Sequence, residues 1–191
     1  MKELLIESKG IKTDEYFIPP FELRKGELVL IYLYGGSHYY KIKEDLADIF
    51  TGKTRHENVN VFKALTFAKN FKESRFERVF NPVTVGKYLK RNADLYVEPE
   101  LGFFKENGFS KNDKVGNLDY SQKKLLSLYS VFTKTRDIVF DLSGEGPVGA
   151  IKTFDFVKDQ IKNDGAAILI DWATDMKDDC DKFITLEWLS V

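Results

Sequence analysis

An α/β fold built on a mixed sheet is predicted for this chain of 191 residues. Several short runs are apolar without alternation, which is typical of strands that are covered on both faces. In the C-terminal third, these runs alternate with segments whose apolar residues recur at helical spacing. The runs are residues 28–34, 138–140 and 166–170. Buried strands that alternate with helices predict a sheet with helices on both faces.

The first forty residues are predicted to be an antiparallel β part. Residues 4–6 form a short apolar run, and residues 16–18 lead into Pro19, which suits an edge strand or a turn because proline lacks the N–H that a central strand needs. Residues 22–26 are predicted to be a turn. The following strand, residues 28–34, is predicted to end where Gly35 and Gly36 break the apolar run.

Helices are predicted where apolar residues return every three or four positions. The first runs from about residue 42 to residue 50, with Leu46, Ile49 and Phe50 on one face and Gly52 as its stop. Residues 59–67 are predicted to form one strand, and Pro82 is expected in the first turn of a helix that ends at Arg91. Further helices are predicted at 120–132 and 147–161, and a last strand at 182–186.

Composition excludes several kinds of site. The 29 Lys and Arg nearly balance the 30 Asp and Glu, so the net charge is −1. One cysteine excludes an internal disulfide and a cysteine-based zinc site, and two histidines leave little for a histidine-rich metal centre. No apolar run approaches the roughly 20 residues that span a bilayer, and the N-terminus lacks the pattern of a signal peptide. We therefore expect a cytoplasmic globular protein without a metal centre.

Residues 35–42 lie between a predicted buried strand and a predicted helix, which is the context of a phosphate-binding loop. The glycine-to-lysine spacing of such a loop is met by Gly35 and Lys41. However, Tyr40 replaces the second glycine and would keep the backbone from cradling phosphates, and Ile42 has no oxygen for a metal ion. Taken alone, the segment is better explained as a strand-to-helix turn with a surface lysine.

Asp141 follows the buried strand 138–140, where an acidic residue can hold the metal of a nucleotide site. The next residue is Leu142 and not a glutamate. An aspartate in this position is also a common cap of the following loop.

Residues 63–91 carry eight Lys and Arg against two Asp and Glu, with aromatic residues interleaved. Such a pattern can mark a nucleic-acid surface. It is more typical of a solvated face above core aromatics, and because the chain is neutral overall no nucleic-acid partner is expected. A partner protein or an acidic lipid surface is the remaining interpretation.

The order of these segments resembles the nucleotide-binding domain of the ATP-binding cassette (ABC) superfamily in degenerate form. Residues 23–30 are similar to the segment that enters the Walker A strand, residues 35–42 stand for Walker A, and residues 138–141 for Walker B. Leu118 and Gln122 remain from the signature motif, whose serine and two glycines are replaced by Asp119, Tyr120 and Ser121.

The resemblance implies a P-loop NTPase-like core over residues 1–191, with a helical subdomain inserted at about 68–132. It implies vestigial nucleotide-binding positions and a signature remnant, but no catalytic residue, because the catalytic glutamate, the signature serine and the switch histidine are all replaced. The vestigial positions are Gly35, Gly36, Lys41 and Asp141, and the signature remnant is Leu118, Ser121 and Gln122. Neither His38 nor His56 follows residue 170, where the switch histidine belongs.

The function implied by the resemblance is that of a catalytically inactive subunit with a structural or regulatory role in an ABC transporter. Its partners would be an active ABC ATPase subunit or a membrane permease subunit, a dimer is compatible with this reading, and it would lie in the cytoplasm or on the inner face of the membrane. The residues proposed for docking are Phe76, Arg78, Phe80 and Lys87. No cofactor is expected, since ATP and Mg²⁺ are doubtful ligands of so altered a site. Two alternatives stay open: a residual ATP-binding protein with weak or no hydrolysis, and a basic module that binds nucleic acid or anionic lipid.

Overall fold

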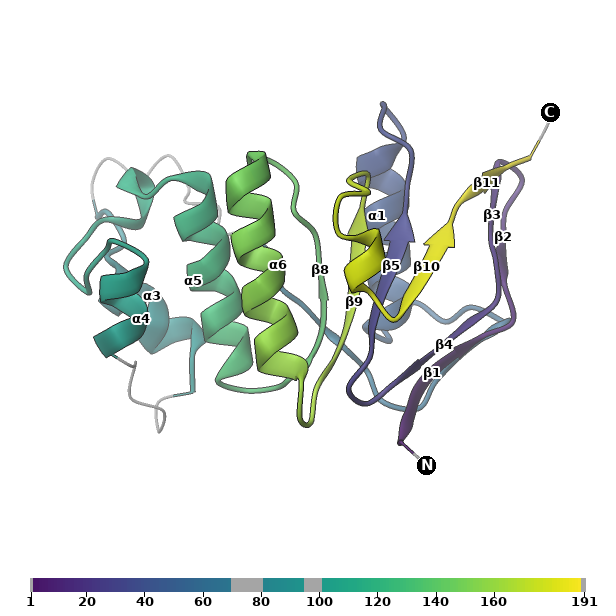
Figure 1. Cartoon of the computed structure of the whole chain (residues 1–191), viewed down its shortest axis with the longest axis horizontal. Coiled ribbons are helices and arrows are strands. Elements are labelled where there is room, and N and C mark those ends of the chain that lie inside the picture. The colour runs from purple at the N-terminus through teal and green to yellow at the C-terminus, as the bar shows by residue number, and fades with distance from the viewer. Residues whose placement is uncertain (1, 70–80, 95–100, 190–191) are drawn as a thin grey trace. The chain divides into compact units, whose positions relative to one another are not determined.

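The structure is a computed structural model of the full chain, and it describes residues 2–69, 81–94 and 101–189 (Figure 1). The chain forms two compact units. The first unit comprises Met1–Phe67, Arg136–Ser143 and Phe154–Val191, and the second comprises Ala68–Thr135 and Gly144–Thr153. Among the described helices, none is both long enough and apolar enough to cross a membrane.

The centre of the first unit is a five-stranded sheet in which all neighbouring strands are parallel. The strand order is β10-β5-β9-β8-β7, and Figure 1 shows β8, β9, β5 and β10 side by side in this order. Their bounds are β5 (Leu28–Tyr32), β7 (Thr66–Phe67), β8 (Asp137–Phe140), β9 (Ala166–Asp171) and β10 (Lys182–Thr185). The predicted mixed α/β class is confirmed. Every residue of β8 and β9 is buried, as their continuous apolar runs indicate.

Two small antiparallel sheets confirm the predicted antiparallel part of the fold. One has the order β4-β1-β6 and the other the order β11-β3-β2. Their bounds are β1 (Leu4–Ser8), β2 (Ile11–Lys12), β3 (Tyr16–Ile18), β4 (Phe21–Arg24), β6 (Val59–Val61) and β11 (Glu187–Trp188).

Two predictions for this part were wrong. Residues 22–26 are not simply a turn, because β4 pairs with β1 and buries Phe21 and Leu23 at the two-residue period of a strand. Residues 59–67 are not one strand, because β6 pairs with β1 whereas β7 pairs with β8 in the parallel sheet. The chain changes sheets between these two strands.

Helix α1 (Tyr39–Phe50) packs against the parallel sheet, behind β5 in Figure 1. Leu46 and Phe50 are fully buried in one hydrophobic core with Val29 and Ile31 of β5. The helix begins three residues before its predicted start at residue 42, so the segment expected to be a loop includes its first turn. In the C-terminal part of the chain, α6 (Pro147–Ile161) has its predicted bounds. A short 3-10 turn, η2 (Lys177–Asp179), precedes β10.

The second unit contains α3 (Val85–Asn92), α4 (Leu101–Glu106), the 3-10 turn η1 (Val115–Asn117) and α5 (Tyr120–Phe132). Helix α5 has its predicted bounds. Helix α3 begins at Val85 and not at Pro82, because Thr84 is its N-cap and accepts a hydrogen bond from the backbone N–H of Lys87 at 3.3 Å. The rings of Phe103 and Tyr129 stack with their centroids 4.3 Å apart in the core of this unit.

Candidate functional site

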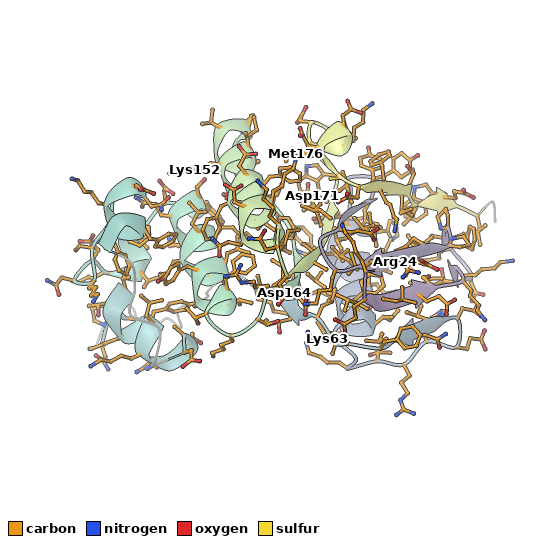
Figure 2. The ribbon with its side chains drawn as sticks, turned by 60° about the horizontal axis from the view of Figure 1, so that its bottom comes forward. Arg24, Lys63, Lys152, Asp164, Asp171 and Met176 are labelled. Atoms are coloured by element: carbon orange, nitrogen blue, oxygen red, sulfur yellow. The ribbon has the colours of Figure 1, made fainter. Side chains whose placement is uncertain are left out.

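The candidate site lies at the carboxyl ends of β5, β9 and β8, the edge at which open parallel sheets form their ligand crevice. Figure 2 labels Asp164, just before β9, and Asp171, its last residue, and shows them at opposite ends of the strand. The segments that follow these strands contain the predicted residues Gly35, Gly36 and Asp141. Helix α1 supplies the side chains that face them.

Asp141 forms an ion pair with a lysine that the sequence reasoning missed. Lys43 Nζ donates to Asp141 Oδ2 at 3.1 Å, and the two side chains are only 9% and 5% exposed. The other carboxylate oxygen of Asp141 accepts a hydrogen bond from the backbone N–H of Ser143 at 2.9 Å. Each charge is therefore met by a partner from the chain itself, as buried charges require.

Lys41, the lysine predicted to bind phosphate, is exposed. Two residues along an α-helix correspond to a turn of about 200°, so Lys41 and Lys43 lie on opposite sides of α1. The helical period offered a signal for Lys43, because Tyr39, Ile42, Lys43 and Leu46 have the spacing of one buried face. This pattern is visible only if the helix is taken to begin at Tyr39 and not at Ile42. A nucleotide-binding role for Lys41 stays a prediction.

Tyr39, the first residue of α1, is 1% exposed and lies between the helix and the strand ends. Its hydroxyl donates to the carbonyl oxygen of Ile170 at 3.1 Å and is 3.0 Å from Ser143 Oγ, from which it can accept. Its ring centroid is 4.4 Å from that of Trp172. Burial, with the nearby negative charge of Asp171, raises the pKa of the phenol far above its ordinary value, so the side chain is neutral.

Asp171 stands at the end of β9, where the resemblance placed the region of the switch histidine. Its carboxylate accepts hydrogen bonds from the backbone N–H groups of Leu142, Trp172 and Ala173 at 2.7, 2.8 and 3.0 Å. Burial raises its pKa above the usual range, against the lowering effect of these bonds, and the charge of Asp141 raises it further. Asp171 thus joins the loops after β8 and β9.

The predicted glycines lie in the exposed segment before α1. A Cβ atom at Gly35 or Gly36 would meet nothing within 4 Å, but Gly36 has a φ of +139°, which disfavours any other residue. The carbonyl of Gly36 accepts from the backbone N–H of Tyr39 at 3.3 Å. The following His38 has its ring 5.8 Å from that of Trp188. These glycines shape the entry to the helix.

In the second unit, the signature remnant closes the start of α5. The Asp119 carboxylate accepts from the backbone N–H of Gln122 at 2.8 Å, and Gln122 Oε1 accepts from the N–H of Asp119 at 3.0 Å. This reciprocal pair is a capping box. Leu118 is buried, and Ser121 lies against Gly149. One of the first-turn N–H groups that the resemblance assigns to a phosphate, that of Gln122, is therefore bonded within the helix start.

Of the predicted docking residues, Phe76, Arg78 and Phe80 lie outside the described residues. Lys87 is exposed, and its Nζ donates to Asn81 Oδ1 at 3.2 Å. Within the described parts of the chain, no three His, Cys, Asp or Glu side chains are grouped so as to hold a metal ion. Burial raises the pKa of Cys180 to about 12, which makes it a poor nucleophile near neutral pH.

No protein-family model matches this sequence, and no curated protein matches it either. Solved structures do match. A metal-chelate type ABC transporter in an inward-facing conformation is similar over 98% of this chain and 84% of its own, with a TM-score of 0.70 and 12% identity. The chain has the ATP-binding cassette fold.

Other structures with this fold come from different settings. The cbiO1 protein of Clostridium perfringens, part of the ABC transporter complex cbiONQ, is similar over 99% of this chain and 88% of its own, with a TM-score of 0.67 and 14% identity. A chain from a complex of an archaeal ribosomal stalk protein with an archaeal ribosome recycling factor is similar over 96% of this chain and 37% of its own, with a TM-score of 0.66 and 16% identity. The cassette fold therefore occurs outside transporters as well.

Proposed function

We propose that this chain is a catalytically inactive ATP-binding cassette-like subunit that serves as a structural or regulatory partner of an active cassette or of a membrane subunit. One observation carries the proposal: Asp141, in the Walker B position, is bound to Lys43 in a nearly closed environment, and Leu142 follows it in place of a catalytic glutamate.

Phosphoryl transfer depends on positioning and on neutralising the charge of the phosphates and their metal ion. The residues here do not fit a magnesium–nucleotide complex. Asp141 is already compensated by Lys43, the ring centre of Tyr39 lies 5.4 Å from the Nζ of that lysine, and Ile42 offers no oxygen to a metal. The groups that remain are those that pack, and the groups that are replaced are those that react.

The capping box at the start of α5 supports the same conclusion independently. A helix N-terminus binds an anion through its bare N–H groups. Here the carboxylate of Asp119 takes one of them and places a negative charge where the resemblance expects a phosphate. The chain would thus lack both elements with which a cassette holds nucleotide between two subunits.

The partner proposal rests on the fold and on the neighbours that share it. Two of the neighbours come from ABC transporters, and one is part of a multi-subunit complex. A position in the cytoplasm or at the inner face of the membrane goes with this role. The archaeal neighbour from the stalk-protein complex is the reason that the proposal leaves the kind of assembly open.

The deciding experiment is a steady-state assay of ATP hydrolysis by the purified chain. We expect no turnover above background, and we expect Lys43→Ala and Lys41→Ala to leave that background unchanged. Hydrolysis well above background that Lys43→Ala abolishes would overturn the proposal. Titration calorimetry with Mg-ATP tests the alternative of a residual nucleotide binder, for which saturable heat without turnover is the signature.

The partner is tested by affinity capture of the tagged chain from its native cell. We expect an active cassette or a protein with several membrane spans to be recovered with it. The double variant Phe76→Ala, Arg78→Glu should weaken that recovery if these residues dock the partner, whereas Lys134→Glu, on an exposed part of the second unit, is the matched control. Recovery of nucleic acid, lost steeply with salt, would favour the basic-module alternative instead.

A further inference from the structure

We infer that the open side edge of the parallel sheet, along β10, binds an extended apolar segment of a partner protein that has basic residues at both of its ends. The segment pairs with β10 through main-chain hydrogen bonds and adds a further strand to the sheet. This inference goes beyond the proposed function. It does not depend on whether the chain hydrolyses ATP, because it concerns the side of the sheet and not the site at the strand ends.

The first argument is the main chain of β10. This strand stands at one end of the order β10-β5-β9-β8-β7, so only one of its two sides is paired, by β5. The N–H of Leu186, directly after the strand, donates to the carbonyl of Tyr32 in β5 at 3.0 Å. Because main-chain groups alternate sides along a strand, Ile184 also faces β5, whereas the N–H and C=O groups of Phe183 and Thr185 face away from it. Among the described residues, none supplies a hydrogen-bond partner on that outer side.

The second argument is that this edge lacks the usual protection. Natural sheet edges avoid pairing with other chains by means of charged side chains, prolines or bulges. The one charged residue of β10 is Lys182, and its ammonium group is turned to Glu27 Oε2 and to the carbonyl of Glu22, both at 2.8 Å. Phe183, in the next position, is 40% exposed. The edge is therefore uncharged where its main-chain groups are open.

The third argument is an exposed aromatic surface beside the edge. The ring centre of Phe183 lies 6.0 Å from that of Tyr32, which lies 5.1 Å from that of Tyr34. Tyr34 is 44% exposed. Exposed apolar patches on folded proteins commonly mark interaction sites. A strand paired with β10 places every second side chain on the face of the sheet that carries Phe183, so its apolar side chains can pack against these rings.

The fourth argument is charge, and it selects the partner. Asp178 and Asp181 precede the open residues, Glu187 follows them, and all three are exposed. Over residues 175–187, five residues are acidic and two are basic, and one of the two basic residues, Lys182, is already bound to Glu27. Opposite charges across an interface favour association and like charges oppose it. A second copy of this chain would bring the same acidic flanks, whereas a segment with Lys or Arg at both ends matches them.

An edge strand that only faces solvent would have the same open groups. The two interpretations differ in whether a matching strand binds, and in what that binding depends on. Strand pairing requires the main-chain donors of the partner, and the acidic flanks require its basic ends.

The first experiment follows the fluorescein-labelled peptide Lys-Lys-Val-Thr-Val-Thr-Val-Thr-Lys-Lys by fluorescence anisotropy as the purified chain is added. Two matched peptides are the controls. One has N-methyl groups on its Val and Thr residues, which removes their main-chain donors, and the other has Glu in place of every Lys. We expect saturable binding of the first peptide and binding at least about tenfold weaker for each control.

Equal binding of the N-methylated peptide would overturn the pairing of strands. Equal binding of the acidic peptide would overturn the basic partner, and the absence of saturable binding would overturn the inference as a whole.

The second experiment places the binding on β10. Thr185→Pro removes the N–H of residue 185, which faces away from β5, and edge strands accept proline in such a position. Thr185→Ala keeps this N–H and is the matched control. We expect Thr185→Pro to weaken binding of the basic peptide at least about tenfold, and Thr185→Ala to change it less than about twofold. Equal binding to the two variants would contradict pairing at this edge.

Hydrogen exchange of the wild type keeps the inference testable if Thr185→Pro does not fold. The amides of Phe183 and Thr185, followed by NMR, should exchange at least about tenfold more slowly when the basic peptide is bound. Unchanged exchange at both positions would overturn the inference. Protection of the same amides at rising protein concentration without peptide would show that a second copy occupies the edge, and would overturn the basic partner. Turnover of ATP would instead contradict only the proposed function.

Discussion

Strand β8 begins with one buried aspartate and is followed by another, and each of the two pairs with lysine. The two ends of the strand differ in how exposed these ion pairs are. At the amino end, Asp137 accepts from Lys25 Nζ at 2.8 Å and pairs with Lys63 Nζ at 2.8 Å. Just beyond the carboxyl end, Asp141 pairs with Lys43 at 3.1 Å. The amino-end pair reaches solvent, since the Lys63 side chain is 48% exposed, whereas that of Lys43 is 9% exposed.

The difference distinguishes a partly exposed ion-pair cluster from a buried ion pair. Lys25 also donates to the carbonyl of Asp164, so the amino-end cluster ties together the turn after β4, the loop before β7 and the turn before β9. The hydrogen bond between Lys63 and Asp137 raises the pKa of the Lys63 ammonium group. The carboxyl-end pair uses the same chemistry at the edge where an α/β sheet binds ligands. There, the charge of Asp141 is matched by Lys43 of the same chain, in a buried position.

The largest effect is expected from Lys43→Met. The change leaves the carboxylate of Asp141 buried without its lysine, and breaking such a pair by removing one partner costs about 3–5 kcal/mol of unfolding free energy. Urea unfolding measures the change. The double variant Lys43→Met, Asp141→Asn is the control, because it removes both charges and should recover a large part of the loss. A loss below about 1 kcal/mol in the single variant would mean that water reaches Asp141 after all.

A smaller effect is expected from Asp137→Asn at the amino end. The two lysines lose a charged acceptor but can turn toward water, so we expect a loss of about 2 kcal/mol, measured by the same unfolding experiment. Lys63→Gln is the matched control, with an expected loss within about 0.5 kcal/mol because its side chain is half exposed. If Asp137→Asn were as costly as Lys43→Met, the two ends would not differ in openness.

The smallest effect concerns pH at the carboxyl edge. Because burial raises the pKa of Asp171 above that of an unfolded aspartate, its contribution to stability is fully present below the ordinary pKa of aspartate and is lost as the pH rises through the folded value. The free energy of unfolding of wild type minus that of Asp171→Asn should therefore fall as the pH rises above about 4, the ordinary pKa of aspartate. Unfolding of both proteins by urea across this range measures the difference. A difference that rises with pH would show that the three backbone N–H bonds outweigh burial.

The sequence predicted the parts of this site that depend on local pattern. The buried run 138–140 placed Asp141 at a strand end, and the spacing of Leu46, Ile49 and Phe50 located the buried face of α1. It did not predict Lys43 or Tyr39 as site residues. The contacts of these two residues reach Asp141 and Ser143, about a hundred positions away along the chain, and local periodicity carries no information about such pairs.

The wrong prediction for the start of α1 explains why Lys41, and not Lys43, was predicted as the lysine of the site. A phosphate loop through residue 41 makes Lys41 the lysine of the site, whereas a helix that begins at Tyr39 turns Lys41 to solvent and both Tyr39 and Lys43 inward. The start of this helix carries no sequence mark, since His38 in the N-cap position makes no side-chain cap bond. At Thr84 and Asp119, by contrast, a cap residue stands directly before the helix.

The chain has two tryptophans, and each is in ring contact with a residue of interest. Trp172 touches Tyr39, and Trp188 touches His38, just before α1. Intrinsic fluorescence can therefore follow the site without an added label. In Trp188→Phe, the remaining emission of Trp172 would report the environment of Tyr39. Trp172 therefore makes a change in the packing of this edge visible in a single-wavelength experiment.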